Sequence, residues 1–208
     1  MPRRITEKSV HGRRKLIGEG DRAKVYFYKD GKLKGLVGRI PKSSIPFAPF
    51  WPPNSLKHQF LRFRAHQIAY LLFPEWNIYP KKFLAEDNQI ISKLLPRSDK
   101  NIRMNGHRRA VERAKETTIP KEAKRPFLEM RKAGLEVHGG PENVSVVNGR
   151  PTFFAIEGMD IKTIRAYLDT NQSKFQRVRF NAIQRALNDY ERVNKLNELD
   201  INEEFGLI

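Results

Sequence analysis

Short runs in which apolar and polar residues alternate fill the N-terminal part of the chain, and this period predicts β-strands. Apolar runs and turn-forming segments follow one another in the order 16–17, 18–20, 24–28, 29–32 and 33–40. We therefore predict an antiparallel meander whose first turn is rich in glycine. The basic, polar residues 1–13 before it are expected to form a loose arm.

A helical period of apolar residues follows a segment that is rich in proline. Residues 41–53 hold five prolines and three large aromatic side chains, which exclude regular structure and indicate an ordered loop. Asn54 and Ser55 can cap a helix, and apolar residues then recur at helical spacing until Pro74. The pattern predicts one long helix between the loop and Pro74.

Two further strands and a charged connection are predicted next. Residues 76–85 and 89–95 read as strands joined by a turn at 86–88. Residues 97–125 carry ten lysines and arginines, and we expect a linker with one or two short helices there. This stretch is either the solvated side of a connection between lobes or a surface that binds polyanions.

The segment from 133 to 160 combines turn signals with two apolar runs. A helix is expected to end at Gly134, and a polar loop over 138–143 leads into a strand over 144–147. An Asn-Gly turn then connects to a strand over 151–156.

The polar side chains at the ends of this predicted hairpin are candidate ligands. Asn143 lies where the first strand begins and Glu157 where the second ends, so we expect both at one end of one hairpin. Their oxygen atoms suit a metal ion with phosphates. Beyond them, helices are predicted over 161–168, 174–187 and 189–199.

Composition narrows the class of protein. The 208 residues are 39% hydrophobic and 10% aromatic, which is typical of a folded chain and excludes wholesale disorder. The absence of cysteine excludes disulfides, thiol nucleophiles and cysteine-ligated zinc. No apolar run reaches about 18 residues, so we expect a soluble, cytoplasmic protein without a membrane span.

The charge balance is strongly basic. Forty lysines and arginines against 23 aspartates and glutamates give a net charge of +17. Such an excess attracts nucleic acid, nucleotide phosphates, acidic proteins or anionic membranes, and it is equally consistent with a solubilising surface.

The glycine-rich turn carries the first motif, Gly18-x-Gly20-x-x-Ala23-x-Val25. Glycine allows backbone amides to approach phosphate oxygens, and a valine on the next strand can lie against a base. A plain hairpin turn is the simpler interpretation of G-x-G alone. The chain continues as a strand after the glycines, which excludes a dinucleotide-binding fold.

Taken together, the motifs resemble those of the protein-kinase-like superfamily, including its small lipopolysaccharide-kinase and aminoglycoside-phosphotransferase branches. The glycine motif is similar to G-x-G-x-x-G-x-V. Pro141-x-Asn143-Val144 resembles the P-x-N-V of a catalytic loop, and residues 153–157 resemble the I-D-F-E segment that follows it. The resemblance covers most of residues 14–168.

This resemblance implies an α+β, two-lobed protein-kinase-like fold, with an antiparallel β-rich N-lobe and a short, mainly helical C-lobe. The corresponding domains are the arm at 1–13, the N-lobe at 14–96, and the linker with a minimal C-lobe at 97–208. It also implies ATP and Mg²⁺ as cofactors. Asn143 and Glu157 would hold the metal, and the nucleotide would lie against Gly18, Glu19, Gly20, Ala23, Val25 and Arg39.

Several positions depart from the family pattern. The strand-three lysine corresponds to Arg39, with Lys42 as the alternative cation. The helix up to Pro74 offers no glutamate to pair with it, and Gln59 or Gln67 is the nearest polar substitute.

The two expected aspartate positions also lack a carboxylate. His138 stands five residues before Asn143, and Gly140 takes the position if the loop is shorter. His138 is a candidate proton acceptor, and a structural role is the alternative. Ala155 aligns with the metal-binding aspartate, which leaves Asn143 and Glu157 as ligands, with Asp160 as a further candidate. Ala155 belongs either to a degenerate kinase or to an active enzyme that was inactivated by substitution.

Three functions follow from these observations. The first is an ATP-dependent phosphotransferase that acts on a protein Ser or Thr hydroxyl. The second is a pseudokinase that scaffolds or regulates a protein partner. The third is a nucleic-acid-binding protein that uses residues 97–125 and the basic N-terminus. The small size also resembles that of minimal kinases that bacteria deliver into host cells, which is the alternative to a cytoplasmic location.

Overall fold

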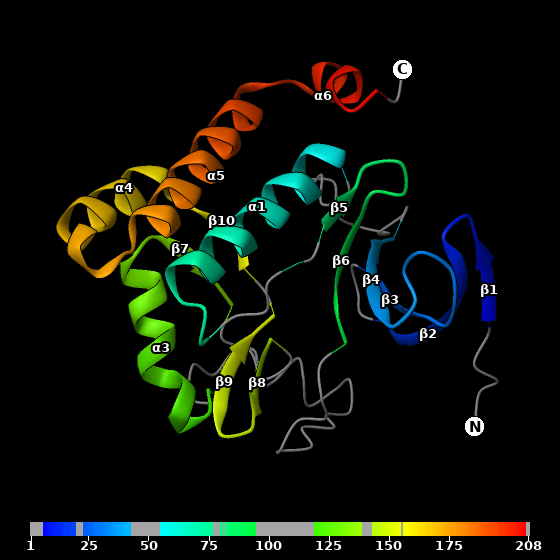
Figure 1. Ribbon diagram of the computed structural model, residues 1–208, viewed down its shortest axis with the longest axis horizontal. Helices are drawn as coiled ribbons and strands as arrows, with labels where there is room; N and C mark the ends of the chain where they lie inside the picture. Colours follow the sequence, from blue (N-terminus) through cyan, green and yellow to red (C-terminus); the bar gives the residue numbers. More distant parts are fainter. Residues whose placement is uncertain are drawn as a thin grey trace, which may run out of the picture. The chain divides into compact units, whose positions relative to one another are not determined.

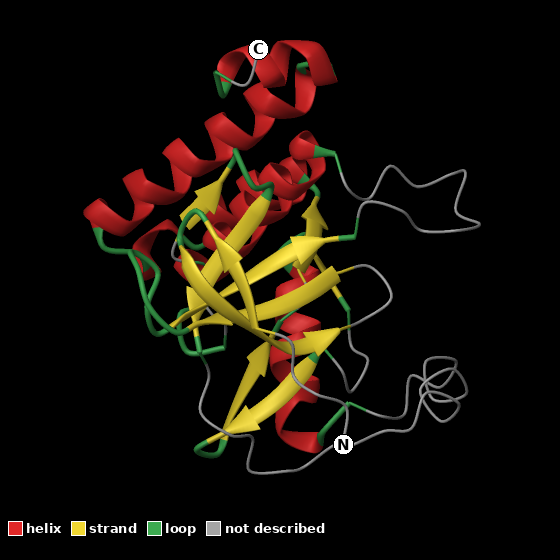
Figure 2. Cartoon of the chain, turned by 90° about the vertical axis from the view of Figure 1, so that its right-hand side faces the viewer, coloured by secondary structure: helices red, strands yellow, loops and turns green. Residues whose placement is uncertain are grey.

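The computed structural model describes residues 6–19, 23–42, 55–76, 80, 82–94, 119–138, 143–154 and 156–206. The chain forms two compact units, each assembled from segments that are distant in sequence. Unit 1 comprises Met1–Phe63, Pro80–Leu95 and Arg192–Ile208, and unit 2 comprises Arg64–Tyr79 and Pro96–Glu191. The described part of the chain mixes helices and strands, so the α+β class is confirmed (Figures 1 and 2).

Unit 1 is built on a curled, six-stranded antiparallel sheet with the order β1-β2-β3-β4-β6-β5. The strands are β1 (Thr6–Ser9), β2 (Gly12–Glu19), β3 (Ala23–Tyr28), β4 (Leu36–Pro41), β5 (Lys82–Leu84) and β6 (Gln89–Lys93). The predicted meander corresponds to β2, β3 and β4 and is confirmed.

The N-terminal arm is the first correction. Thr6–Ser9 form β1 and pair with β2 in a tight antiparallel hairpin, with Ser9 opposite Gly12. The sequence pattern did not predict β1, because its residues are all polar. An edge strand with a solvated face needs few apolar residues.

Two strand boundaries also differ from the predicted ones. β4 begins at Leu36, because residues 33–35 form a turn in which Gly35 has a φ of +81° and donates its N–H to Tyr28. Leu33 lies in this turn and its side chain is buried in the core. An apolar residue at this position therefore does not indicate a strand. Of the strand predicted over 76–85, Lys82–Leu84 form β5, whereas Trp76 and Ala85 lie in bends or turns; residues 77–79 and 81 lie outside the described residues.

The core of unit 1 lies on both faces of the sheet. Phe60 packs its ring against Phe63, Phe83 and Phe205, with centroids 5.1–6.2 Å apart. Leu56, Ile90, Val193 and Ile201 complete this cluster. A second cluster contains Tyr28, Leu33, Leu84 and Ile91.

The long predicted helix is confirmed as α1 (Leu56–Leu72). Ser55 begins it, because its hydroxyl accepts the N–H of His58 at 3.1 Å. Pro74 ends it as expected, since the last helical turn closes with the N–H of Phe73 donating to Ala69. The proline-rich loop before it lies outside the described residues.

Unit 2 carries α3 (Lys121–Lys132), two short strand pairs, α4 (Ile161–Thr170), and most of α5 (Arg177–Lys195). β7 (Leu135–Val137) pairs with β10 (Ile156–Met159), and β8 (Val144–Val147) pairs with β9 (Arg150–Phe153). Gly134, with a φ of +95°, follows α3 as predicted. Asn148 and Gly149 both have positive φ, so the predicted Asn-Gly hairpin turn is confirmed.

Three details of the C-terminal half of the chain were predicted wrongly. The strand predicted over 151–156 is two strands, β9 and β10, and their partners differ. The helices predicted over 174–187 and 189–199 are one helix, α5, because Tyr190 and Val193 continue its buried stripe. A separate helix, α6 (Glu198–Glu204), starts at Asn197, which forms a capping box with Asp200.

The charged connection is described only at its end. Residues 97–118 lie outside the described part of the chain, and residues 121–125 belong to the first turns of α3. None of the described helices combines the length and apolar character needed to cross a bilayer.

Candidate functional site

The glycine motif lies in unit 1 at the connected end of the β2–β3 hairpin, where β2 ends and β3 begins. Gly18 pairs with Val25, and a bulge between Leu16 and Gly18 shifts the register by one residue. Ala23 begins β3 and is buried. Gly20 lies outside the described residues. Four of the five predicted residues of this motif therefore lie on two adjacent strands.

The two candidate cations come from β4 and its C-terminal end. Arg39 lies directly opposite Val25 and is half-buried. Lys42 follows β4 and forms an ion pair with Glu19, with 2.8 Å between Nζ and Oε1. The structure therefore brings Arg39 and Lys42 alongside the glycine motif.

Glu19 and Lys42 carry opposite charges at this end of the sheet. The hydrogen bond and the positive charge of Lys42 hold the pKa of the Glu19 carboxyl below its ordinary value. Glu19 is therefore ionised at neutral pH and offsets part of the positive charge of Lys42.

The predicted metal ligands lie in unit 2, and one expectation about them was wrong. Asn143 immediately precedes β8, and its carbonyl oxygen accepts the N–H of Phe154 at 2.7 Å. Glu157 lies in β10, at a bulge between Ile156 and Gly158. The two residues thus belong to two different strand pairs rather than to one end of one hairpin.

A buried histidine that sequence reasoning missed supports this segment. The ring Nε2 of His66, on α1, accepts the N–H of Ile156 at 3.4 Å, and the side chain is buried. Because Ile156 precedes Glu157, this bond helps to fix the strand that carries Glu157. Its only sequence signal was a histidine at a position flanked by apolar helical residues.

The two glutamines of α1 named as substitutes are placed as follows. Gln59 is buried. Gln67 accepts a hydrogen bond from the guanidinium of Arg64, also on α1, at 2.6 Å. Arg64 pairs in addition with Asp189, and this ion pair ties α1 to α5 within unit 2.

The remaining candidates are placed as follows. His138 is exposed and directly follows β7. Gly140 and Ala155 lie outside the described residues. Asp160 caps α4, since its carboxylate accepts from the N–H groups of Lys162 and Thr163 and from the Thr163 hydroxyl. The Thr163 hydroxyl is the main reason why the pKa of Asp160 lies below its ordinary value.

The described residues contain no group of three or more histidine, aspartate or glutamate side chains that could hold a metal. The donors available at Asn143 and Glu157 are one amide and one carboxylate. Oxygen donors of this kind fit a hard cation such as Mg²⁺, which keeps several waters and takes phosphate oxygens as further ligands.

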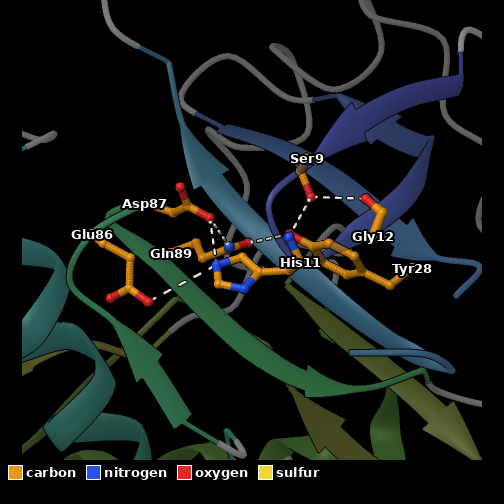
Figure 3. A network of polar contacts seen from close by, with 7 residues as sticks. All are labelled: Ser9, His11, Gly12, Tyr28, Glu86, Asp87 and Gln89. Atoms are coloured by element: carbon orange, nitrogen blue, oxygen red, sulfur yellow. Dashed lines mark hydrogen bonds and ion pairs between the residues drawn. The ribbon is translucent and has the colours of Figure 1, made fainter. Parts of the chain in front are cut away.

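A second polar cluster lies in unit 1, away from the glycine motif in sequence. His11 Nε2 lies 3.0 Å from Asp87, which accepts a hydrogen bond from Gln89 at 2.8 Å (Figure 3). Gln89 in turn accepts the hydroxyl of the buried Tyr28 at 3.0 Å. No pattern in the sequence points to this network, because its members come from strands and turns that are far apart along the chain.

No protein-family model matches this sequence, and no curated protein matches it either. The functional interpretation therefore rests on the residues and their geometry.

Proposed function

We propose that this chain is an ATP-dependent phosphotransferase of the protein-kinase type that transfers the γ-phosphate to a protein Ser or Thr hydroxyl. The observation that carries the proposal is the arrangement of strands after α3. The β8–β9 hairpin lies in sequence between β7 and β10, which pair with each other. This nesting places Asn143 before β8 and Glu157 in β10, in the order that the kinase resemblance requires.

Unit 1 supports the proposal from its own residues. Its meander β2–β4, then α1, then the strands β5 and β6 follow the element order of a kinase-like N-lobe. The amides near Gly18 suit phosphate oxygens, and Arg39 or Lys42 supplies a cation beside them.

In-line phosphoryl transfer needs positioning and neutralisation of charge more than covalent chemistry. Mg²⁺, when bound, supplies most of that neutralisation, and the side-chain oxygens of Asn143 and Glu157 are the donors that would hold it. His138, exposed in the loop after β7, would accept the proton of the acceptor hydroxyl.

The second candidate is a pseudokinase that regulates a protein partner. It is favoured by one specific observation, namely that His138 (or Gly140, if the loop is shorter) and Ala155 stand where kinases carry aspartates. Without these carboxylates, nucleotide binding could persist while phosphoryl transfer is lost.

The first experiment is thermal unfolding with ATP, with and without Mg²⁺. We expect ATP to raise the melting temperature of the wild type, and Mg²⁺ to add to the shift. Asn143→Ala should abolish the Mg²⁺-dependent part. Asn181→Ala, an exposed asparagine of α5, is the matched control and should retain it. No response to ATP in the wild type would refute both candidates.

Transfer of label from γ-labelled ATP to a generic protein substrate then separates the two candidates. Labelling by the wild type supports the enzyme. Labelling only by Ala155→Asp indicates an active framework that has lost its metal-binding carboxylate, and no labelling by either protein favours the pseudokinase.

A further inference from the structure

The helix α3 has a buried side and a basic side. It packs on β7, β8 and β9 within unit 2 and buries Ala123, Pro126 and Met130 there. Successive residues of an α-helix are about 100° apart, so the residues midway between these lie on the opposite, outer side. That outer side, here called the basic face of α3, consists of exposed residues: Lys121, Lys124, Arg125, Leu128, Arg131 and Lys132.

Most cations of this face have no carboxylate partner. Arg125 pairs with Glu129 on the flank of the helix, with 2.7 Å between Nε and Oε1. In the described part of the chain, no acidic side chain pairs with Lys121, Lys124 or Lys132. Lys121 and Lys124 also lie in the first turn of α3, where the positive end of the helix dipole disfavours a cation. Anionic groups of a partner would reduce both costs.

An exposed leucine lies at the centre of the basic face. The side chain of Leu128 is 63% exposed. Lys124 and Lys132 precede and follow it by four residues and so lie on the same ridge of the helix. An apolar centre with a charged rim is the pattern of a protein interface. A phosphate backbone would use the cations and leave the leucine without a partner.

The C-terminal segment has the opposite charge. Residues 196–208 hold four aspartates and glutamates and no lysine or arginine, although the whole chain has a net charge of +17. α6 lies in this segment and buries Ile201 in the core of unit 1. Leu199, Asp200 and Glu203 lie on the other side of α6 and are exposed, Leu199 by 69%. α6 therefore presents a leucine beside two carboxylates.

We propose that the basic face of α3 binds α6 of a second copy of this chain, in a dimer with twofold symmetry. Leu128 packs against Leu199 of the partner subunit, and the carboxylates of that α6 meet the lysines around Leu128. Because the axis is twofold, α3 of each copy binds α6 of the other, so the contact forms twice. A specific interface needs about 1,000 Å² or more, which a doubled contact supplies more readily than a single one.

Two other anionic partners match the basic face less well. A helix that lies on an anionic membrane needs a wide apolar side, and Leu128 among five cations does not provide one. Nucleic acid would use the cations alone. The dimer is also independent of phosphoryl transfer, because its residues do not include those assigned to the nucleotide or the metal.

Sedimentation velocity of the full-length protein over a range of concentrations measures the association. At low salt we expect the mass to rise with concentration to that of a dimer, and added salt should favour the monomer because it screens the charges. Lys124→Glu/Lys132→Glu should weaken association by about tenfold or more. The matched control is Lys162→Glu/Lys174→Glu, which makes the same change in charge at exposed lysines of α4 and of the turn after it. It should associate as the wild type does.

Exchange of charge between the two helices tests their pairing directly. Glu203→Lys/Glu204→Lys changes α6, keeps Asp200 in its capping box, and removes only the exposed ion pair of Glu204 with Arg192. This variant and Lys124→Glu/Lys132→Glu should each be monomeric alone, because the charges that meet in their dimers no longer complement each other. An equimolar mixture of the two should form a heterodimer, since both of its contacts are complementary again.

Circular dichroism confirms that each variant is folded, and Leu128→Ala should weaken association several-fold. A wild type that stays monomeric at every concentration, equal association of the two lysine variants, or a mixture without heterodimer would each overturn the proposal. A dimer that nuclease converts to monomer would overturn it too, because nucleic acid would then join the two copies.

Discussion

Glu19 and Lys42 face each other at the ends of β2 and β4, with 2.8 Å between Lys42 Nζ and Glu19 Oε1. The glycine motif contains Glu19, and Lys42 is one of the two candidate cations for the phosphates. In the proposed nucleotide site, the carboxylate would compete with phosphate for the same ammonium group. This pair makes the charge of the candidate nucleotide site directly testable.

Glu19→Gln is expected to strengthen ATP binding. The change removes a negative charge from the motif and takes the carboxylate of Glu19 away from Lys42. The energies of exposed ion pairs suggest a gain of about two- to fivefold. Isothermal titration of ATP in the presence of Mg²⁺ measures it. Glu86→Gln is the control, because it makes the same change at an exposed glutamate of the β5–β6 turn. An equal gain in ATP affinity in both variants would show that the effect comes from the net charge of the protein and not from the Glu19–Lys42 pair.

Gly12→Ala is expected to destabilise unit 1 much more than Gly35→Ala does. Both glycines have positive φ, so both variants carry a backbone strain of about 1–2 kcal/mol. At Gly12 the new methyl group also meets the carbonyl of Asp30, whereas at Gly35 nothing lies within 4 Å. Urea unfolding of the two variants gives the comparison. Equal losses of unfolding free energy would show that the contact of the new methyl group with the Asp30 carbonyl adds nothing to the backbone strain.

Most secondary structure was predictable, because local pattern decides it. The period of α1, the Asn-Gly turn and the end of α3 at Gly134 depend on residues close in sequence. β1 and β7 were missed, since each is short and owes its existence to a partner strand, β2 or β10, that pattern alone cannot identify.

The candidate site was predictable only in part, for a similar reason. Motif spacing led to Gly18 and Asn143, but the ion pair of Glu19 with Lys42 depends on the register between strands. His66 acts through a backbone N–H that is 90 residues away in sequence. Contacts of this kind leave no periodic signal, because a single side chain at a single position makes each of them.

Asp30→Asn is expected to make the free energy of unfolding less dependent on pH in the acid range. The N–H of Arg13, and then its guanidinium, hold the pKa of Asp30 below its usual value in the folded state. The stabilisation is therefore present above the unfolded value of about 3.9 and is lost as the pH falls through the folded pKa. Urea midpoints between about pH 3 and pH 7 measure it. Asp169→Asn on α4 is the control, and a parallel profile for both variants would contradict the assignment.

Tyr28→Phe is expected to destabilise the protein by about 1–3 kcal/mol, because it leaves the buried side-chain oxygen of Gln89 without its donor. Urea unfolding followed by circular dichroism measures the loss. Tyr167→Phe is the control, since its ring lies 6.0 Å from Phe73 and its side chain is only half-buried. Pairing Tyr28→Phe with Gln89→Leu should recover part of the stability, and a purely additive double variant would argue against the bond.

Asp160→Ala and Asp160→Asn together test whether Asp160, which follows β10, acts as a helix cap or as a metal ligand. As the cap of α4, Asp160 accepts the N–H of Lys162 at 3.0 Å and the hydroxyl of Thr163 at 2.7 Å. Asparagine caps a helix about as well as aspartate does, so Asp160→Asn should melt near the wild type, whereas Asp160→Ala should melt about 2–4 °C lower. The Mg²⁺-dependent part of the ATP shift should be the same in both variants, because neither removes Asn143 or Glu157. If Asp160→Asn melts normally but loses the response to Mg²⁺, the carboxylate is a metal ligand and its capping role is secondary.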